Sequence, residues 1–192
     1  MNSLELKRFT AASLLVGLVL LLGFTPIGLI PLGFINVTIL CIPVVIGTLL
    51  MGLKTGLLLG FTFGSVSLIN LLGPRASALA SALMGASPVL AVLMCYVPRL
   101  LLPLATHLTF RALKARNEKL GYAVAAVAGS LTNTVFYLGL MFLFYVLTGL
   151  DVQKVALLIG GTGLIAGTSE AVVAALLVPP IVLALKRLHY FA

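Results

Sequence analysis

Long apolar runs, separated by short polar, glycine or proline breaks, dominate the pattern of the chain. Runs long enough to cross roughly 30 Å of hydrocarbon fall at about residues 4–23, 36–53, 55–72, 86–110, 122–147 and 155–185. Most charged residues lie in or next to the breaks. This pattern predicts an all-α integral membrane protein with six transmembrane helices, folded as a single domain over residues 1–192.

The break between the first two predicted helices, residues 24–35, is apolar but has a composition that resists helix formation. It contains Pro26, Gly28, Pro31 and Gly33; each proline removes a backbone donor, and each glycine adds a cost in backbone entropy. Lipid cannot satisfy exposed backbone groups, so such a segment must pack on protein or line a cavity. We therefore expect this long outer loop between helices 1 and 2 to be a gate over a binding site.

The basic residues indicate the orientation in the membrane. An even number of spans places both ends of the chain on one side, and nine of the twelve lysines and arginines fall on that side. Only Arg75 and Lys154 fall opposite, and Arg99 lies within a span. The positive-inside rule then predicts cytoplasmic termini in a cell membrane. The outer loop at residues 73–85 fits a connector and a gate equally well.

The overall composition supports the membrane class. The chain is 61% hydrophobic and 8% charged, with a mean hydropathy of +1.26. The net charge of +8 reflects membrane orientation under the same rule, so we expect the lipid bilayer, and no nucleic acid, as the surrounding partner.

Polar residues inside the predicted spans are the candidates for chemistry. Arg99, Asn133 and Glu170 lie in the fourth, fifth and sixth spans at comparable depth, and Tyr137 lies one turn outward from Asn133. An arginine at such depth needs a partner inside the protein, and Glu170 is the available acid. Either these residues form a satisfied internal network, or some of them bind a polar solute. Arginine is well suited to binding a carboxylate.

Two further polar residues lie near the outer end of the third span. Asn70 could cap the helix end or donate to a ligand. Arg75 could extend to the outer headgroups or attract an anionic solute. Both interpretations remain open for each residue.

The first span carries small residues on one side. Ala12, Ser13 and Gly17 are among them, and Ser13 and Gly17 have the small-xxx-small spacing that lets two helices approach closely. This face is a candidate contact for a partner helix, although small residues also fill ordinary bundle interiors.

Motifs for catalysis and metal binding are missing from the sequence. His107 and His189 have no HExxH motif or cysteine cluster around them, and no GxSxG motif occurs. The string GTLLMGLKT imitates a phosphate-binding loop, but Leu53 interrupts the pattern before Lys54. With four acidic residues in the chain, we expect no catalytic residues, metal or cofactor, and no enzyme activity.

Several stretches, taken in order and with their spacing, carry a family resemblance: TPIGLIPLGFINVT, IPVVIGTLLMGLKTGLLLGFTFGSVSLI, YVPRLLL, GSLTNTVFYLGLMFL and EAVVAALLVPPI. Through them the chain resembles the substrate-binding S-component of energy-coupling factor (ECF) vitamin transporters, in the group that includes riboflavin and pantothenate binders. The resemblance covers nearly the whole chain.

The resemblance implies a six-helix subunit that captures a water-soluble vitamin outside the cell for ATP-driven uptake. It implies as partners a transmembrane coupling subunit and two cytoplasmic ATPase subunits. The family's contact with the coupling subunit is an AxxxA pattern on the first helix; here that pattern is reduced to Ser13 and Gly17 next to Ala12.

The family's ligand site lies in the outer half of the subunit. Carried onto this chain, the site corresponds to Asn36, Thr38, Asn70, Arg75, Arg99, Asn133, Tyr137 and Glu170. The motif positions of Arg99, Asn133 and Glu170 recur in members with different vitamins, so the resemblance also allows them a scaffold role.

The residue types favour pantothenate as the vitamin, because its carboxylate, hydroxyls and amide suit a site with one arginine and several amides. Riboflavin is the close rival, since aromatic residues could stack on a flavin. The aromatic candidates are Phe24, Phe34, Phe61, Phe63 and Tyr137. The remaining alternatives are an S-component for another vitamin, and a stand-alone membrane carrier or enzyme.

Overall fold

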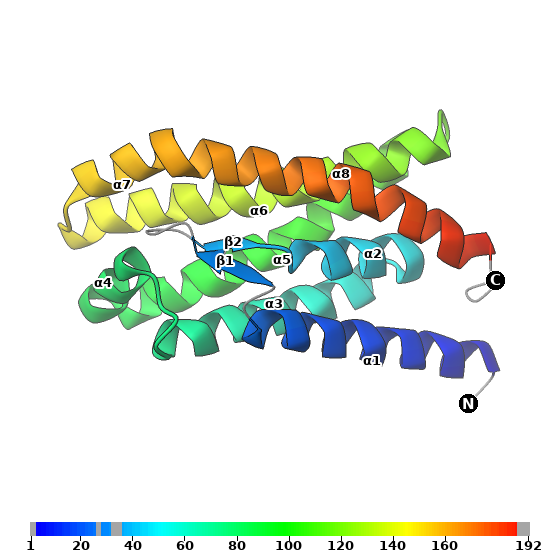
Figure 1. The fold of residues 1–192 in the computed structure, drawn as a ribbon, viewed down its shortest axis with the longest axis horizontal. Helices are drawn as coiled ribbons and strands as arrows, with labels where there is room; N and C mark the ends of the chain where they lie inside the picture. Colours follow the sequence, from blue (N-terminus) through cyan, green and yellow to red (C-terminus); the bar gives the residue numbers. More distant parts are fainter. Residues whose placement is uncertain (1–2, 26–27, 32–35, 188–192) are drawn as a thin grey trace.

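The computed structural model describes residues 3–25, 28–31 and 36–187, which form a helical bundle with one small strand pair (Figure 1). The elements in chain order are α1 (Ser3–Phe24), β1 (Leu29–Pro31), β2 (Asn36–Thr38), α2 (Cys41–Met51), α3 (Leu53–Leu72), α4 (Ala78–Ala86), α5 (Pro88–Leu113), α6 (Glu118–Thr148), α7 (Val152–Leu158), the π-helical turn η1 (Ile159–Gly163) and α8 (Leu164–Arg187).

Five of the helices in the described residues, α1, α3, α5, α6 and α8, are long and apolar enough to cross a membrane. The predicted membrane-embedded helical architecture is therefore confirmed. Helix α1 begins, and α8 ends, at the same end of the molecule (Figure 1), as an even number of crossings requires. The count of six spans and the cytoplasmic side of the termini stay predictions.

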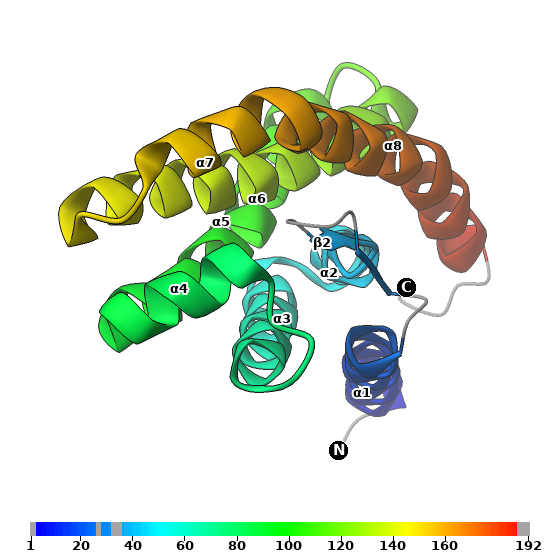
Figure 2. The same ribbon diagram turned by 60° about the vertical axis from the view of Figure 1, so that its left-hand side comes forward.

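Helix α2 lies in the middle of the bundle (Figure 2). It packs on α1, α3, α5, α6 and α8, and every residue from Cys41 to Leu49 is buried, as expected for a helix that is apolar on all sides. The second span was predicted from residue 36, but the helix begins only at Cys41, because residues 36–38 pair as a strand. Its 11 residues extend about 16 Å, well short of a hydrocarbon core.

A tight turn joins α2 to α3, as predicted. Gly52 is both the C-cap residue of α2 and the N-cap residue of α3, and its φ is 88°. L side chains rarely adopt this conformation, so the position favours glycine. The turn sets α3 beside α2 and directs α3 back toward the other end of the bundle.

Helices α3 and α5 pack closely because glycines face the contact. A Cβ atom at Gly60 would overlap the Arg99 carbonyl oxygen of α5, and one at Gly64 would lie 2.6 Å from the Tyr96 ring. This close approach brings the α3 side chain Phe63 to the Arg99 guanidinium.

The two outer loops of the predicted topology contain secondary structure. In the first, β1 and β2 pair antiparallel, with Ile30 opposite Val37; residues 26–27 and 32–35 of the predicted gate lie outside the described residues. The second, expected as an irregular loop, contains α4. Ser77 caps α4 by accepting from the Ala80 amide, and α4 packs on α5. Its alanine- and leucine-rich composition favours helix.

A cluster of four residues, here called the terminal cluster, ties α5, α6 and α8 together where α8 ends. Lys186 Nζ donates to Glu118 Oε1 at 2.6 Å, and the Tyr122 hydroxyl donates to the same oxygen. Phe110 stacks on Tyr122 with ring centroids 4.8 Å apart, and the Lys186 ammonium lies 5.2 Å from the centre of the Tyr122 ring. Each charged group in this cluster has an opposite charge beside it.

Candidate functional site

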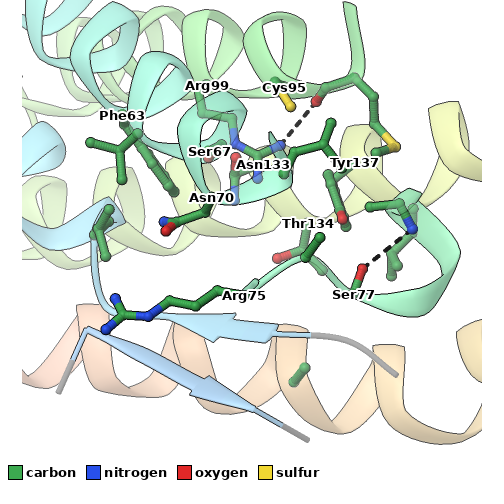
Figure 3. A pocket seen from close by; sticks show the side chains of 18 of the residues that line it. Phe63, Ser67, Asn70, Arg75, Ser77, Cys95, Arg99, Asn133, Thr134 and Tyr137 are labelled. Atoms are coloured by element: carbon green, nitrogen blue, oxygen red, sulfur yellow. Dashed lines mark hydrogen bonds between the residues drawn. The ribbon is translucent and has the colours of Figure 1, made fainter. Parts of the chain in front are cut away.

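A cavity lies between α3, α5, α6 and α8, beside the strand pair (Figure 3). The space between its walls, together with the open solvent at its mouth, is about 850 Å³. Its polar lining comprises Ser67, Asn70, Arg75, Ser77, Arg99, Asn133, Thr134, Tyr137 and Glu170.

Arg99 is the buried cation of this cavity, with 6% of its surface exposed. Its Nη1 donates to the Met94 carbonyl oxygen at 3.0 Å. Its guanidinium carbon lies 4.6 Å from the ring centre of Tyr137 and 5.2 Å from that of Phe63. These four residues are here called the cavity cluster. Aromatic faces attract a guanidinium most strongly where water is excluded, so the two rings stabilise the charge.

Two buried polar atoms beside the cavity have no hydrogen-bond partner in the part of the chain that the structure describes. Arg99 Nε and Asn133 Oδ1 are buried and make no hydrogen bond among the described residues. A buried polar group without a partner costs about 1–3 kcal/mol. Unpaired donors and acceptors beside a cavity are the arrangement expected of groups that a ligand, or a small adjustment on ligand binding, would satisfy.

Glu170 lies on the α8 side of the same cavity. Its Oε2 accepts a hydrogen bond from Thr134 Oγ1 of α6 at 3.2 Å. The sequence offered Glu170 as the ion-pair partner of Arg99, but within the described residues the Arg99 guanidinium bonds a backbone carbonyl and forms no ion pair with Glu170. The cavity thus has a cationic wall on α5 and an acidic wall on α8.

Asn70 and Arg75 tie the rim of the cavity to helix α1. Asn70 Nδ2 donates to the Gly23 carbonyl at 3.0 Å, and Arg75 Nη1 donates to the Phe24 carbonyl at 2.7 Å. These carbonyls belong to the last turn of α1, where no intrahelical donor is available. Figure 3 shows Arg75 stretched beside the strand pair and away from Arg99. Asn70 therefore makes a helix-capping contact, at the end of α1, whereas the contact of Arg75 with α1 was not among the alternatives predicted for it.

The predicted convergence of three spans is confirmed, since Arg99, Asn133 and Glu170 line one cavity together with Tyr137. Asn36 and Thr38 lie in β2, but their side chains are outside the described part of the structure, as is the whole of Phe34. Of the aromatic residues named for a flavin, the described lining contains Phe63 and Tyr137.

Several lining residues were not identified from the sequence. Ser67 lies on the α3 face that also carries Phe63 and Asn70, and its spacing of four residues from Phe63 is a helical repeat that could have identified it. Ser77 reaches the cavity because the segment after α3 folds into α4, which the sequence pattern did not predict. Met94 contributes through its backbone oxygen, for which side-chain types give no signal.

Potential metal ligands do not gather anywhere in the described residues: no group of three or more histidine, cysteine, aspartate or glutamate side chains could hold an ion. The polar groups of the cavity are instead one guanidinium, amides, hydroxyls and one carboxylate. This set can bind a polar organic solute through charge and hydrogen bonds.

The predicted partner face lies on the least buried long helix. For α1, 11% of its most apolar window is buried, against 44% for α5. Ser13 and Gly17 are exposed and Ala12 is half-buried, and a Cβ atom at Gly17 would meet nothing within 4 Å. The surface over these residues is therefore open to another helix or to lipid.

Comparisons with known proteins agree with this architecture. Residues 7–182 match the family described as ECF transporter, substrate-specific component. Over 161 residues, covering 78% of each chain, the sequence is 29% identical to the pantothenic acid transporter PanT of Lactococcus lactis subsp. cremoris (strain MG1363). The matched region contains all the helices from α2 to η1 and most of α1 and α8. The chain therefore belongs to the family of ECF transporter substrate-specific components, and is a multi-pass protein of the bacterial cell membrane.

Proposed function

We propose that the chain is the substrate-binding subunit of an ECF-type ABC transporter and that it captures pantothenate outside the cell. The observation that carries the proposal is Arg99, a buried cation on a cavity wall that has no carboxylate partner among the described residues. A vitamin that carries its own carboxylate would complete the pair. The similarity to a pantothenic acid transporter supports this choice of vitamin.

The charges on the two walls suggest one orientation for the ligand. The carboxylate of pantothenate binds the Arg99 guanidinium, whose fork of N–H groups matches a carboxylate, and lies away from the like charge of Glu170. The hydroxyl end then lies toward Glu170, which accepts hydrogen bonds, and the central amide lies within reach of Asn133. In this orientation each polar group of the ligand has a complementary group in the cavity.

Riboflavin is less well supported by the cavity. Among the described residues, Phe63 and Tyr137 are its aromatic lining, and both rings already pack on the Arg99 guanidinium. Phe61, a further stacking candidate, is 54% exposed and packs against Tyr96. A flat flavin ring would therefore find few free aromatic faces.

A ligand panel on the purified subunit tests the vitamin. We expect titration calorimetry to detect pantothenate binding, and riboflavin to leave its own fluorescence unquenched on mixing with the protein. Quenching of riboflavin together with no heat from pantothenate would overturn the assignment. Uptake by vesicles that contain the chain alone, without ATP, would favour the stand-alone carrier, and turnover of a substrate would favour the enzyme.

For the partners, we propose that the coupling subunit docks on the α1 face formed by Ala12, Ser13 and Gly17, and that two cytoplasmic ATPases drive uptake. Gly17→Leu should abolish copurification of the coupling subunit, because a large side chain blocks close helix approach. Gly139→Leu is the matched control on α6, since a Cβ atom there also meets nothing within 4 Å. If the coupling subunit copurifies equally well with both variants, the α1 face is not the docking surface.

For the outer loop, we propose that residues 24–35 form a gate over the cavity. The Asn70 and Arg75 contacts to the end of α1 would fix its first hinge. A spin label at Leu32 should lose mobility when pantothenate is added. If the mobility of the label is the same with and without pantothenate, residues 24–35 do not act as a gate.

A further inference from the structure

Helix α5 contains two internal prolines that interrupt its own hydrogen bonding. Pro98 and Pro103 both lie inside the helix. Proline has no N–H group, so the carbonyl four residues earlier loses its usual donor. Pro98 therefore releases the carbonyl of Met94, and Pro103 releases the carbonyl of Arg99. In an apolar environment each released carbonyl must find another partner.

The two released carbonyls meet different surroundings. Arg99 Nη1 donates to the Met94 oxygen at 3.0 Å in a buried position, shown by a dashed line in Figure 3. The Arg99 oxygen lies against Gly60 of α3, where a Cβ atom would overlap it. Only the carbonyl released by Pro98 is thus in contact with the guanidinium.

This contact and the two rings fix the guanidinium from three sides. The Met94 oxygen holds one edge, while the Tyr137 and Phe63 rings lie 4.6 Å and 5.2 Å from the guanidinium carbon. A neutral carbonyl orients the charge without neutralising it. The charge of Arg99 is therefore available to a ligand. Its side chain is already fixed before the ligand binds, so binding costs less side-chain entropy.

We infer that Pro98 is a positioning residue for the anionic ligand: by leaving the Met94 carbonyl without an intrahelical donor, it supplies the acceptor that aims the Arg99 guanidinium into the cavity. The inference rests on the proposed function in one respect, namely that Arg99 binds the ligand carboxylate. The sharing of the Met94 carbonyl between Pro98 and Arg99 does not depend on the identity of the ligand.

The sharing is tested without ligand, by thermal unfolding of the purified subunit. Arg99→Met leaves the Met94 carbonyl without a donor and should lower the melting temperature. Pro98→Ala restores a backbone N–H for that carbonyl, so it should raise the melting temperature more in the Arg99→Met background than in the wild type. Pro103→Ala, the matched control, should have the same effect in both backgrounds. Additive effects of Pro98→Ala and Arg99→Met would overturn the shared carbonyl.

The positioning role is tested by ligand affinity. Pro98→Ala gives the Met94 carbonyl a competing backbone donor, so we expect pantothenate affinity to fall about tenfold, with no change for the neutral analogue in which an alcohol replaces the carboxylate. Pro98→Ala favours helix, so loss of folding is not expected to obscure the result. Pro103→Ala should change neither affinity.

The outcomes separate the two ideas. If Arg99→Met weakens pantothenate binding but Pro98→Ala does not, the positioning role is wrong and the proposed function stands. If Arg99→Met leaves pantothenate affinity unchanged, the proposed carboxylate contact fails, and the positioning role fails with it. A tenfold loss with Pro98→Ala for both pantothenate and its alcohol analogue would also overturn the positioning role, because a general distortion of the cavity would explain it.

Discussion

The cavity cluster and the terminal cluster are built alike and differ in one partner. In both, a cation lies over aromatic rings: Arg99 over Tyr137 and Phe63, and Lys186 over Tyr122. Lys186 also contacts a carboxylate, Glu118, at 2.6 Å. The structure gives Arg99 a neutral backbone carbonyl instead, and no ion pair within the described residues.

Burial makes this difference important. The side chains of Lys186 and Glu118 are 43% and 53% exposed, so water stabilises each charge and the pair adds little. Arg99 is 6% exposed and forms no ion pair among the described residues, and such an arginine inside a membrane protein is expensive. The terminal cluster is complete as it stands and serves to tie helices together. The cavity cluster is incomplete, which is what a binding site for an anion requires.

Removing the cation of each cluster in turn should have the largest effect. Arg99→Met should weaken pantothenate binding by about 2 kcal/mol or more, the scale of a lost charge-assisted hydrogen bond. Lys186→Met is the matched control and should leave the affinity unchanged, because Glu118 is its partner. Titration calorimetry on both purified variants measures the difference. Equal affinities in the two variants would place Arg99 in the scaffold.

A second variant separates binding from stability at a buried position. Asn133 is 5% exposed, and its Oδ1 has no partner in the described residues. Asn133→Ala should therefore weaken pantothenate binding by about 1 kcal/mol, the usual value of one hydrogen bond, and lower the melting temperature of the free subunit only slightly. A large loss of stability with unchanged affinity would show that the residue belongs to an internal network.

The smallest effect is expected at the terminal cluster. Glu118→Gln removes the charge that pairs with Lys186 and leaves an acceptor for the Tyr122 hydroxyl. For a half-exposed pair the loss in the free energy of unfolding should stay below about 1 kcal/mol and should shrink in high salt. Thermal unfolding at two salt concentrations measures it. Any change in pantothenate affinity would contradict the purely structural role of this cluster.

The sequence predicted the depth of polar residues better than their contacts. Arg99, Asn133 and Glu170 line one cavity. Their similar depth was predictable because the rise per residue is constant along a helix. The hydrogen-bond partner of Arg99 could not be predicted from residue spacing, since different rotamers of a long side chain reach different groups at the same depth. Pro98, directly before Arg99, was the available clue that a backbone carbonyl would be unpaired.

Segments that depend on distant contacts were also missed. Helix α2 begins at Cys41 and not at residue 36, because residues 36–38 pair with β1. Strand pairing depends on the partner strand more than on composition. Helix α4 forms in a stretch that the sequence predicts as a loop from its glycine, proline, serine and alanine content, although Ser77 supplies a typical helix cap. Both segments lie near the cavity, so the depth of the polar residues was predictable and the structure of the neighbouring segments was not.

The central claim is that the buried Arg99 binds the carboxylate of the transported vitamin. The most direct measurement is the ratio of two affinities, that of pantothenate and that of its alcohol analogue, in the wild type and in Arg99→Met. We predict a large preference for pantothenate in the wild type that falls close to unity in the variant, because only the carboxylate distinguishes the two ligands. The same ratio in both proteins would contradict the claim.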